Sequence, residues 1–182
     1  INFNHGDPLE LADQVFLFKR TVRQAALKHD MYATFMAKPH ENEPGSSMHI
    51  HQSVMDVKTG KNIFASKDGA PSKLFLNHIG GLQRYLAAAL SLCAPNVNSY
   101  RRLDPHFEAP NQIKASPIDR GSMIRIPLGN ERSKRVEVRS IAPDANPYLA
   151  IYTIFRTGLE GPTEEGDENK RSRTRFLSDN IY

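Results

Sequence analysis

The chain has 182 residues, of which 39% are hydrophobic and 24% charged, a composition typical of a globular protein long enough for one core. Its formal charge of +4 is too small an excess to indicate nucleic-acid binding. No apolar run approaches the roughly 18 residues of a membrane helix, so we expect neither nucleic acid nor membrane as a partner.

Cys93 is the only cysteine, so the chain cannot form an internal disulfide. It lies in an apolar helical run, which favours a small core residue in a reducing compartment, and we expect a cytoplasmic protein. Near the end of the chain, basic residues 170–175 follow acidic residues 164–168. Opposite charges in a Gly- and Ser-containing stretch indicate an exposed loop rather than a nucleic-acid-binding arm.

The first predicted element is a helix. Asp7 suits its N-cap and Pro8 its first turn, and apolar residues recur at helical spacing to about His29. Residues 32–37 then have the composition of a strand. A short polar loop, residues 38–44, begins and ends near prolines and delivers the chain to a second strand.

That second strand is predicted from the alternation of residues 45–54, because successive side chains of a strand point to opposite faces. One face is apolar and would meet the core: Met48, Ile50 and Val54. The other face is polar: His49, His51 and Ser53. Two imidazoles and a hydroxyl can hold a metal ion and a polyanion. The alternative is a half-buried strand whose histidines bind nothing.

A long helix is predicted to start at Ser72, which suits its N-cap, and to run through Leu92. Gly80 and Gly81 in its middle destabilise a helix unless a neighbour packs closely against them.

The segments around this helix are less regular. Residues 56–71 are turn-rich, with a hairpin turn expected at residues 59–62. Residues 96–110 have no clear period, and their aromatic and arginine content favours a functional loop. A strand over residues 122–127 and a final helix over residues 148–159 complete the prediction.

A further strand is predicted over residues 135–139. Arg135, Glu137 and Arg139 share one face, and two valines fill the other. One interpretation is a solvated ladder of ion pairs that contributes little stability. The other places this strand beside residues 45–53, so that a carboxylate and an imidazole hold a divalent cation while guanidiniums bind phosphate.

The second interpretation carries a geometric prediction. His49 and Glu137 should lie on adjacent strands with converging side chains. Such a face has the groups that phosphoryl transfer needs, since that chemistry depends mostly on positioning and charge stabilisation.

Five stretches, in this order, resemble the signature motifs of the glutamine synthetase family. They are Gly-Ser-Ser-Met-His-Ile-His-Gln-Ser at 45–53, Asn-Ser-Tyr-Arg-Arg-Leu at 98–103 with Glu-Ala-Pro at 108–110, Asp-Arg with Ile-Arg-Ile-Pro within 119–127, Arg-Val-Glu-Val-Arg at 135–139, and Ala-Asn-Pro-Tyr-Leu at 145–149. The order and spacing hold from Asp7 to about Gly161, so the resemblance covers most of the chain.

The resemblance implies an α+β fold: a curved antiparallel sheet, part of a barrel, backed by long helices over residues 1–182. It implies a ligase in which ATP phosphorylates the side-chain carboxylate of glutamate and ammonia then displaces phosphate to give glutamine. Mg²⁺ or Mn²⁺ ions would neutralise the transferring phosphoryl group. Family members form stacked rings, so a homo-oligomer is expected.

The family pattern also implies a role for each matching residue. The metal ligands would be His49 and Glu137. ATP and its phosphates would be bound by His51, Ser53, Arg120, Arg125 and Arg135. Glutamate would be bound by Gly45, Arg102 and Arg139. The catalytic residues would be Arg120, which holds phosphate charge, and Glu108, which shields the acyl phosphate and takes a proton from ammonium.

Several features depart from the family pattern. Pro44 and Ser47 stand where Asn and Gly are usual, so one amide contact to the amino-acid substrate is missing. Further carboxylate metal ligands and a small N-terminal domain would precede Ile1, so we expect the 182-residue chain by itself to lack ligase activity. Tyr182 falls near a tyrosine that some bacterial members adenylylate; the alternative is an ordinary exposed tyrosine.

Two other functions stay open at this point. Pro44 resembles a Pro-Gly-Ser-x-Met-His variant of γ-glutamyl-amine ligases, which use an amine such as putrescine, whereas Glu108 favours ammonia. The third reading is a non-catalytic relative that binds a nucleotide without turnover.

Overall fold

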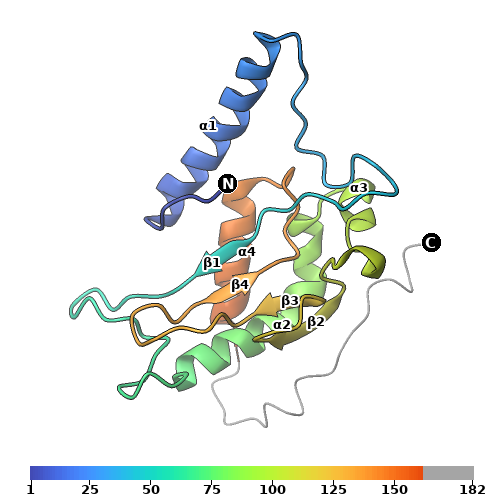
Figure 1. Ribbon diagram of the computed structural model, residues 1–182. Helices are drawn as coiled ribbons and strands as arrows, with labels where there is room; N and C mark the ends of the chain where they lie inside the picture. Colours follow the sequence, from blue (N-terminus) through green and yellow to red (C-terminus); the bar gives the residue numbers. More distant parts are fainter. Residues whose placement is uncertain (162–182) are drawn as a thin grey trace.

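The sheet and its helices are seen in a computed structural model, which describes residues 1–161 (Figure 1). The helices are α1 (Pro8–Leu27), α2 (Lys73–Cys93), α3 (Val97–Arg101) and α4 (Pro147–Leu159), with a 3-10 turn, η1, at Pro105–Phe107. The strands are β1 (Ile50–Gln52), β2 (Gln112–Ser116), β3 (Ser122–Arg125) and β4 (Val136–Val138). The architecture is therefore α+β, as predicted. The charged runs at 164–168 and 170–175, and Tyr182, lie outside the described residues.

The sheet has the strand order β1-β4-β3-β2, with α2 and α4 packed behind it (Figure 1). β4 pairs antiparallel with both β1 and β3, but β2 and β3 are parallel. The expectation of a wholly antiparallel sheet is thus wrong, and β2 was not predicted at all. Parallel neighbours usually need a crossover of about a dozen residues. Here residues 117–121 suffice, because the strands they join are so short.

The helices begin where the sequence predicts. The Asp7 carboxylate accepts from the backbone N–H groups of Leu9 and Glu10 at 2.9 and 3.2 Å, and Pro8 occupies the first turn of α1. The Ser72 hydroxyl accepts from the N–H of Phe75 at 3.1 Å. Such caps satisfy donors that have no partner within the helix, which explains why local sequence is enough to locate these helix starts.

The strand predicted over residues 32–37 is wrong. Among the described residues no strand pairs with this segment, which runs as extended chain. Phe35 packs against α1 instead of a sheet: its ring meets the Phe18 ring edge-on, with centroids 5.9 Å apart. The hairpin turn at residues 59–62 is present, with Gly60 at φ +65° and an isolated bridge between Met55 and Asn62.

The core lies between the sheet and the pair α2 and α4. Its fully buried members include Phe64, Leu82, Met123 and Val138. Cys93 is buried there as well, and burial raises the pKa of its thiol to about 12, which confirms an inert core residue. Among the described helices, none is both long and apolar enough to cross a membrane.

The α2–α4 contact explains a glycine in the middle of α2. A Cβ added to Gly81 would lie 2.3 Å from the carbonyl oxygen of Thr157 in α4. A glycine in mid-helix predicts a closely packed neighbour, and at Gly81 that neighbour is the backbone of α4.

His78, also on α2, gives the fold a pH dependence. Its side chain is buried beside the Phe64 ring, with centroids 5.1 Å apart, and its Nε2 has no hydrogen-bond partner among residues 1–161. Burial lowers the pKa of His78 from 6.5 to about 4. The unfolded chain therefore binds the proton more tightly, and stability is complete above about pH 6.5 and is lost as the pH falls toward 4.

We expect the free energy of unfolding to fall by about 2–3 kcal/mol between pH 7.5 and pH 4.5 through His78. Urea denaturation of wild type and His78→Leu at both pH values measures this. Between the two pH values, the free energy of unfolding of His78→Leu should fall by about 2–3 kcal/mol less than that of wild type. An equal loss in the two proteins would contradict the assignment.

Candidate active site

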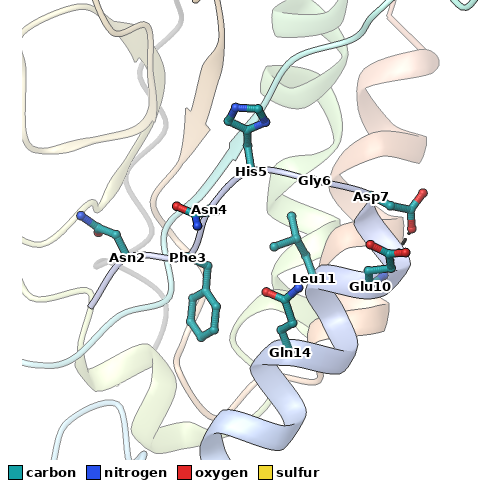
Figure 2. A pocket seen from close by; sticks show the side chains of 9 residues that line it. All are labelled: Asn2, Phe3, Asn4, His5, Gly6, Asp7, Glu10, Leu11 and Gln14. Carbon is teal, nitrogen blue, oxygen red and sulfur yellow. Dashed lines mark hydrogen bonds between the residues drawn. The ribbon is translucent and has the colours of Figure 1, made fainter.

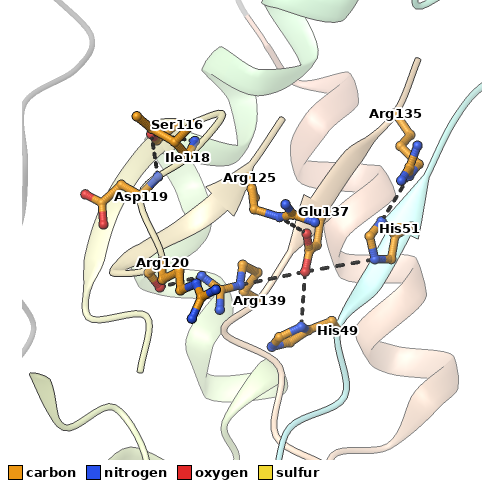
Figure 3. A network of polar contacts seen from close by, with 10 residues as sticks. All are labelled: His49, His51, Ser116, Ile118, Asp119, Arg120, Arg125, Arg135, Glu137 and Arg139. Carbon is orange, nitrogen blue, oxygen red and sulfur yellow. Dashed lines mark hydrogen bonds and ion pairs between the residues drawn. The ribbon is translucent and has the colours of Figure 1, made fainter. Parts of the chain in front are cut away.

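Glu137 of β4 lies at the centre of a polar cluster on the sheet (Figure 3). The register of β1 against β4 sets His51 directly opposite Glu137. The Nε2 of His51 is 3.9 Å from the Oε1 of Glu137, and the Nδ1 of His49, just before β1, is 3.1 Å from the same oxygen. The predicted convergence of His49 and Glu137 is confirmed.

Arginines surround the remaining side of Glu137. The Nε of Arg125, paired with Glu137 in the β3–β4 register, donates to Oε2, and the Nε of Arg139 is 3.7 Å from Oε1. Arg135 reaches the cluster through His51, since its Nε donates to Nδ1 of that ring at 3.3 Å. The predicted face of His, Glu and Arg side chains is thus assembled on adjacent strands.

Burial decides between the two interpretations of this strand. Glu137 is only 3% exposed and its neighbours Val136 and Val138 are fully buried, so a solvated ladder is excluded. Burial acts to raise the pKa of Glu137, but hydrogen bonds from His49 and Arg125 and the nearby positive charges outweigh it and hold the pKa at about 2. Glu137 is therefore an anion at neutral pH.

His51 behaves differently. Burial lowers its pKa; Glu137 opposes this effect, while Arg135 and Arg125 add to it. The lowered pKa favours the neutral ring, whose Nδ1 accepts from Arg135 and whose Nε2 faces Glu137.

A hollow of about 380 Å³ opens beside the cluster. It is lined by Pro117, Ile118, Arg120, Arg125, Glu137 and Arg139. Three guanidiniums and one carboxylate give it a net positive charge, which suits an anionic ligand. Another hollow, of about 370 Å³, lies at the start of α1, but Figure 2 shows its His5 and Asp7 directed apart, so they do not converge on a ligand.

Arg120 and Glu108 meet at the rim of the hollow. The Nη1 of Arg120 donates to the Oε2 of Glu108 at 2.9 Å, and the Arg120 carbonyl accepts from Nη1 of Arg139. Glu108 has φ +54° and ψ +21°, a left-handed conformation that is uncommon for a residue other than glycine. Such backbone strain is concentrated at functional sites.

Gly45 and Arg102 adjoin each other, and Arg102 contacts the cluster through Arg139. A Cβ on Gly45 would lie 2.5 Å from the carbonyl oxygen of Ala37 and 2.6 Å from Cγ of Arg102, so only glycine fits. Arg102 is 4% exposed and donates from Nη2 to the Arg139 carbonyl at 3.1 Å, while its Nε has no hydrogen-bond partner in the described part of the chain. Burial lowers the pKa of Arg102 to about 10, which leaves it cationic at neutral pH.

Two residues complicate the sequence prediction. Ser53 follows β1 and is exposed, and no contact joins it to the Glu137 cluster within the described residues. Lys114 was missed: it pairs with Asp119, whose Oδ1 accepts from the N–H of Gly121 at 2.8 Å, and so braces the loop that carries Arg120. The alternation of apolar Ile113 with polar Lys114 was the signal in the sequence that could have predicted this strand and the side of it on which Lys114 lies.

The donors present fit part of a divalent-cation site. His49 and Glu137 offer an imidazole nitrogen and a carboxylate from adjacent elements. Within residues 1–161, no group of three or more His, Cys, Asp or Glu side chains is placed to hold a metal. Mg²⁺ commonly binds one or two protein side chains and completes its shell with water and substrate phosphates, which is compatible with two donors here.

Comparison with known proteins gives the family. The family model for the glutamine synthetase catalytic domain matches residues 1–177. The chain belongs to the glutamine synthetase family. It is 42% identical over 166 residues to gamma-glutamylputrescine synthetase PuuA of Escherichia coli K12, covering 91% of this chain and 35% of that protein.

Two archaeal glutamine synthetases are similarly close. That of Thermococcus kodakarensis is 41% identical over 182 residues, and that of Halobacterium salinarum is 40% identical over 169 residues. These matches cover 100% and 92% of this chain but 39% and 37% of the relatives. The glutamine synthetase domain described here thus spans well under half the length of these relatives.

Proposed function

We propose that the protein carrying this domain is an ATP-dependent ligase that joins glutamate to ammonia through γ-glutamyl phosphate. The observation that carries the proposal is Glu137: a buried anion held between His49 and two arginines, beside a cationic hollow. Phosphoryl transfer needs such a concentration of positioned charge. The family and its named relatives support the same chemistry.

In this proposal His49 and Glu137 hold a Mg²⁺ or Mn²⁺ ion, which when bound neutralises the transferring phosphoryl group. The guanidiniums of Arg120, Arg125 and Arg135 bind the phosphates. His51 and Ser53 line the ATP side.

Glutamate binds through Gly45, Arg102 and Arg139. The absence of a Cβ at Gly45 brings backbone close to Arg102, whose guanidinium donates to the backbone carbonyl of Arg139. The Arg139 guanidinium lines the hollow and donates to the Arg120 carbonyl. Glutamate carries two carboxylates, and fixed guanidinium forks are suited to recognise such groups.

Glu108 serves the second half of the reaction. Its carboxylate accepts a proton from ammonium; the ammonia nitrogen then forms a bond to the acyl carbon as the bond to phosphate breaks. The pairing of Glu108 with Arg120 at the rim supports this role, because it places the carboxylate next to the phosphate-binding guanidinium.

The proposal extends to the intact protein. By family resemblance its sheet forms part of a curved barrel, its subunits assemble as stacked rings, and it acts in the cytoplasm.

The acceptor is the part of the proposal most open to test. Pro44, and the similarity to gamma-glutamylputrescine synthetase, favour a larger amine, because proline offers no side-chain amide and leaves the site less selective. Glu108 favours ammonia, because a small ammonium ion must be captured and deprotonated. We propose ammonia as the acceptor.

We expect the intact protein to turn over ammonium with a kcat/KM at least equal to those for putrescine and a monoamine. Glu108→Ala should reduce ammonium turnover by about 10²–10⁴-fold, the usual contribution of a general base. Product formation and ADP release measure both. A preference of more than about tenfold for an amine would identify an amine ligase. Magnesium-dependent ATP binding without any product would identify a non-catalytic relative.

A further inference from the structure

Lys38 is a buried cation outside the cluster around Glu137. It is 7% exposed and stands at the base of the loop that leads to Gly45. Its backbone is fixed on both sides by Asn98 of α3, whose side chain accepts from the Lys38 N–H at 2.8 Å and donates to the Lys38 carbonyl at 2.7 Å. The start of the lysine side chain is thus held rigidly.

The other end of the side chain makes two contacts. Nζ donates to the carbonyl of Glu43 at 2.5 Å, and it lies 3.6 Å from the centroid of the Phe107 ring. A buried cation over an aromatic face is a stabilising arrangement that strengthens with desolvation. Glu43 is two residues before Gly45, and Phe107 directly precedes Glu108. One ammonium group therefore joins the loop before Gly45 to the segment that carries Glu108.

The segment that carries Glu108 has need of such an anchor. It is the short 3-10 turn η1, where Pro105 and His106 are exposed and Phe107 is half-buried. Glu108 itself is exposed and left-handed, and its carboxylate accepts from Arg120 at the rim of the hollow. A small rotation at Phe107 would move the carboxylate away from that partner.

We propose that Lys38 is a positioning residue that sets the location of Glu108 through the Phe107 ring. This inference rests on the proposed function for its catalytic consequence. The ammonium group of Lys38 links the segment that carries Glu108 to the loop before Gly45. The acceptor-binding residue Glu108 and the glutamate-binding residue Gly45 therefore keep a fixed relative position.

The test compares Lys38→Met, which keeps the alkyl stem, with Lys38→Arg, which keeps a cation over the ring, and with Phe107→Leu. Lys61→Met, at an exposed lysine in the 59–62 turn, is the control. Amide hydrogen exchange of residues 104–110, measured by mass spectrometry on the intact protein, reports how firmly the segment is held, without any turnover. Steady-state kinetics supply kcat and KM for ammonium and for ATP.

We expect Lys38→Met and Phe107→Leu to speed exchange at residues 104–110 at least fivefold and to lower kcat/KM for ammonium about tenfold, with KM for ATP unchanged. Lys38→Arg should retain most activity, Lys61→Met should match wild type, and the double variant Lys38→Met/Phe107→Leu should be no worse than the more impaired single variant.

Unchanged exchange in Lys38→Met, or additive losses in the double variant, would overturn the inference. The two ideas can fail separately. If Lys38→Met speeds exchange at residues 104–110 but the wild-type protein makes no γ-glutamyl product, the Lys38–Phe107 link is supported and the proposed function is rejected.

Discussion

Glu137→Gln is expected to reduce γ-glutamyl transfer by the intact protein by about 10³-fold or more. Glutamine has the same shape but no charge, so the site loses the anion that His49, Arg125 and Arg139 surround. In the proposed reaction that anion helps to hold the divalent cation, and removal of one preorganised charge from such a site commonly costs about 10²–10³-fold before any loss of metal is counted.

The measurements are steady-state turnover and calorimetric titration of Mg²⁺ with a non-hydrolysable ATP analogue. Glu131→Gln, at an exposed glutamate in the turn before β4, should match wild type in both. The free energy of unfolding should also fall in Glu137→Gln, because the guanidiniums of Arg125 and Arg139 lose the anion that they face. A folded Glu137→Gln protein with wild-type turnover would remove Glu137 from the mechanism.

Gly81→Ala is expected to lower the free energy of unfolding by about 3 kcal/mol, or roughly 6–12 °C in Tm for a chain of this size. In an exposed helix the same change would stabilise by about 1 kcal/mol, because alanine is the better helix former. Here the new methyl group would lie 2.3 Å from the Thr157 carbonyl oxygen and 2.8 Å from the Gly161 nitrogen. Both are backbone atoms, so neither can rotate away.

Gly6→Ala is the matched control, since an added Cβ there meets nothing within 4 Å. Its Tm should stay within about 2 °C of wild type. Calorimetry of the two variants decides the matter, and a neutral or stabilising Gly81→Ala would show that α2 and α4 lie further apart than described here.

The sequence predicted best what depends on near neighbours along the chain. Asp7 and Ser72 cap helices through atoms two or three residues away, so their positions can be read directly. The period of two around Glu137 correctly separated the valines from the charged side chains. The same period, with the ordered motifs, was enough to predict that His49 and Glu137 meet.

Other features depended on which segments lie side by side. Residues 32–37 resemble a strand, but Phe35 packs against α1 and no partner strand is present among the described residues. β2 was missed and its parallel pairing with β3 was not anticipated, because a short strand gains its hydrogen bonds from a neighbour that local propensity does not identify. Lys38 shows no signal in sequence for its contact with Phe107.

By itself, the sequence determined the family, the helix starts and the set of charged groups on one sheet face, because these follow from local hydrogen bonding and from side-chain alternation. Only the tertiary structure decided that Glu137 is buried and held anionic with a pKa of about 2, since burial and the arrangement of His49 and Arg125 arise from three separate segments brought together. The free energy of a buried charge depends on its distances in space to other charges, and these distances cannot be read from positions along the sequence.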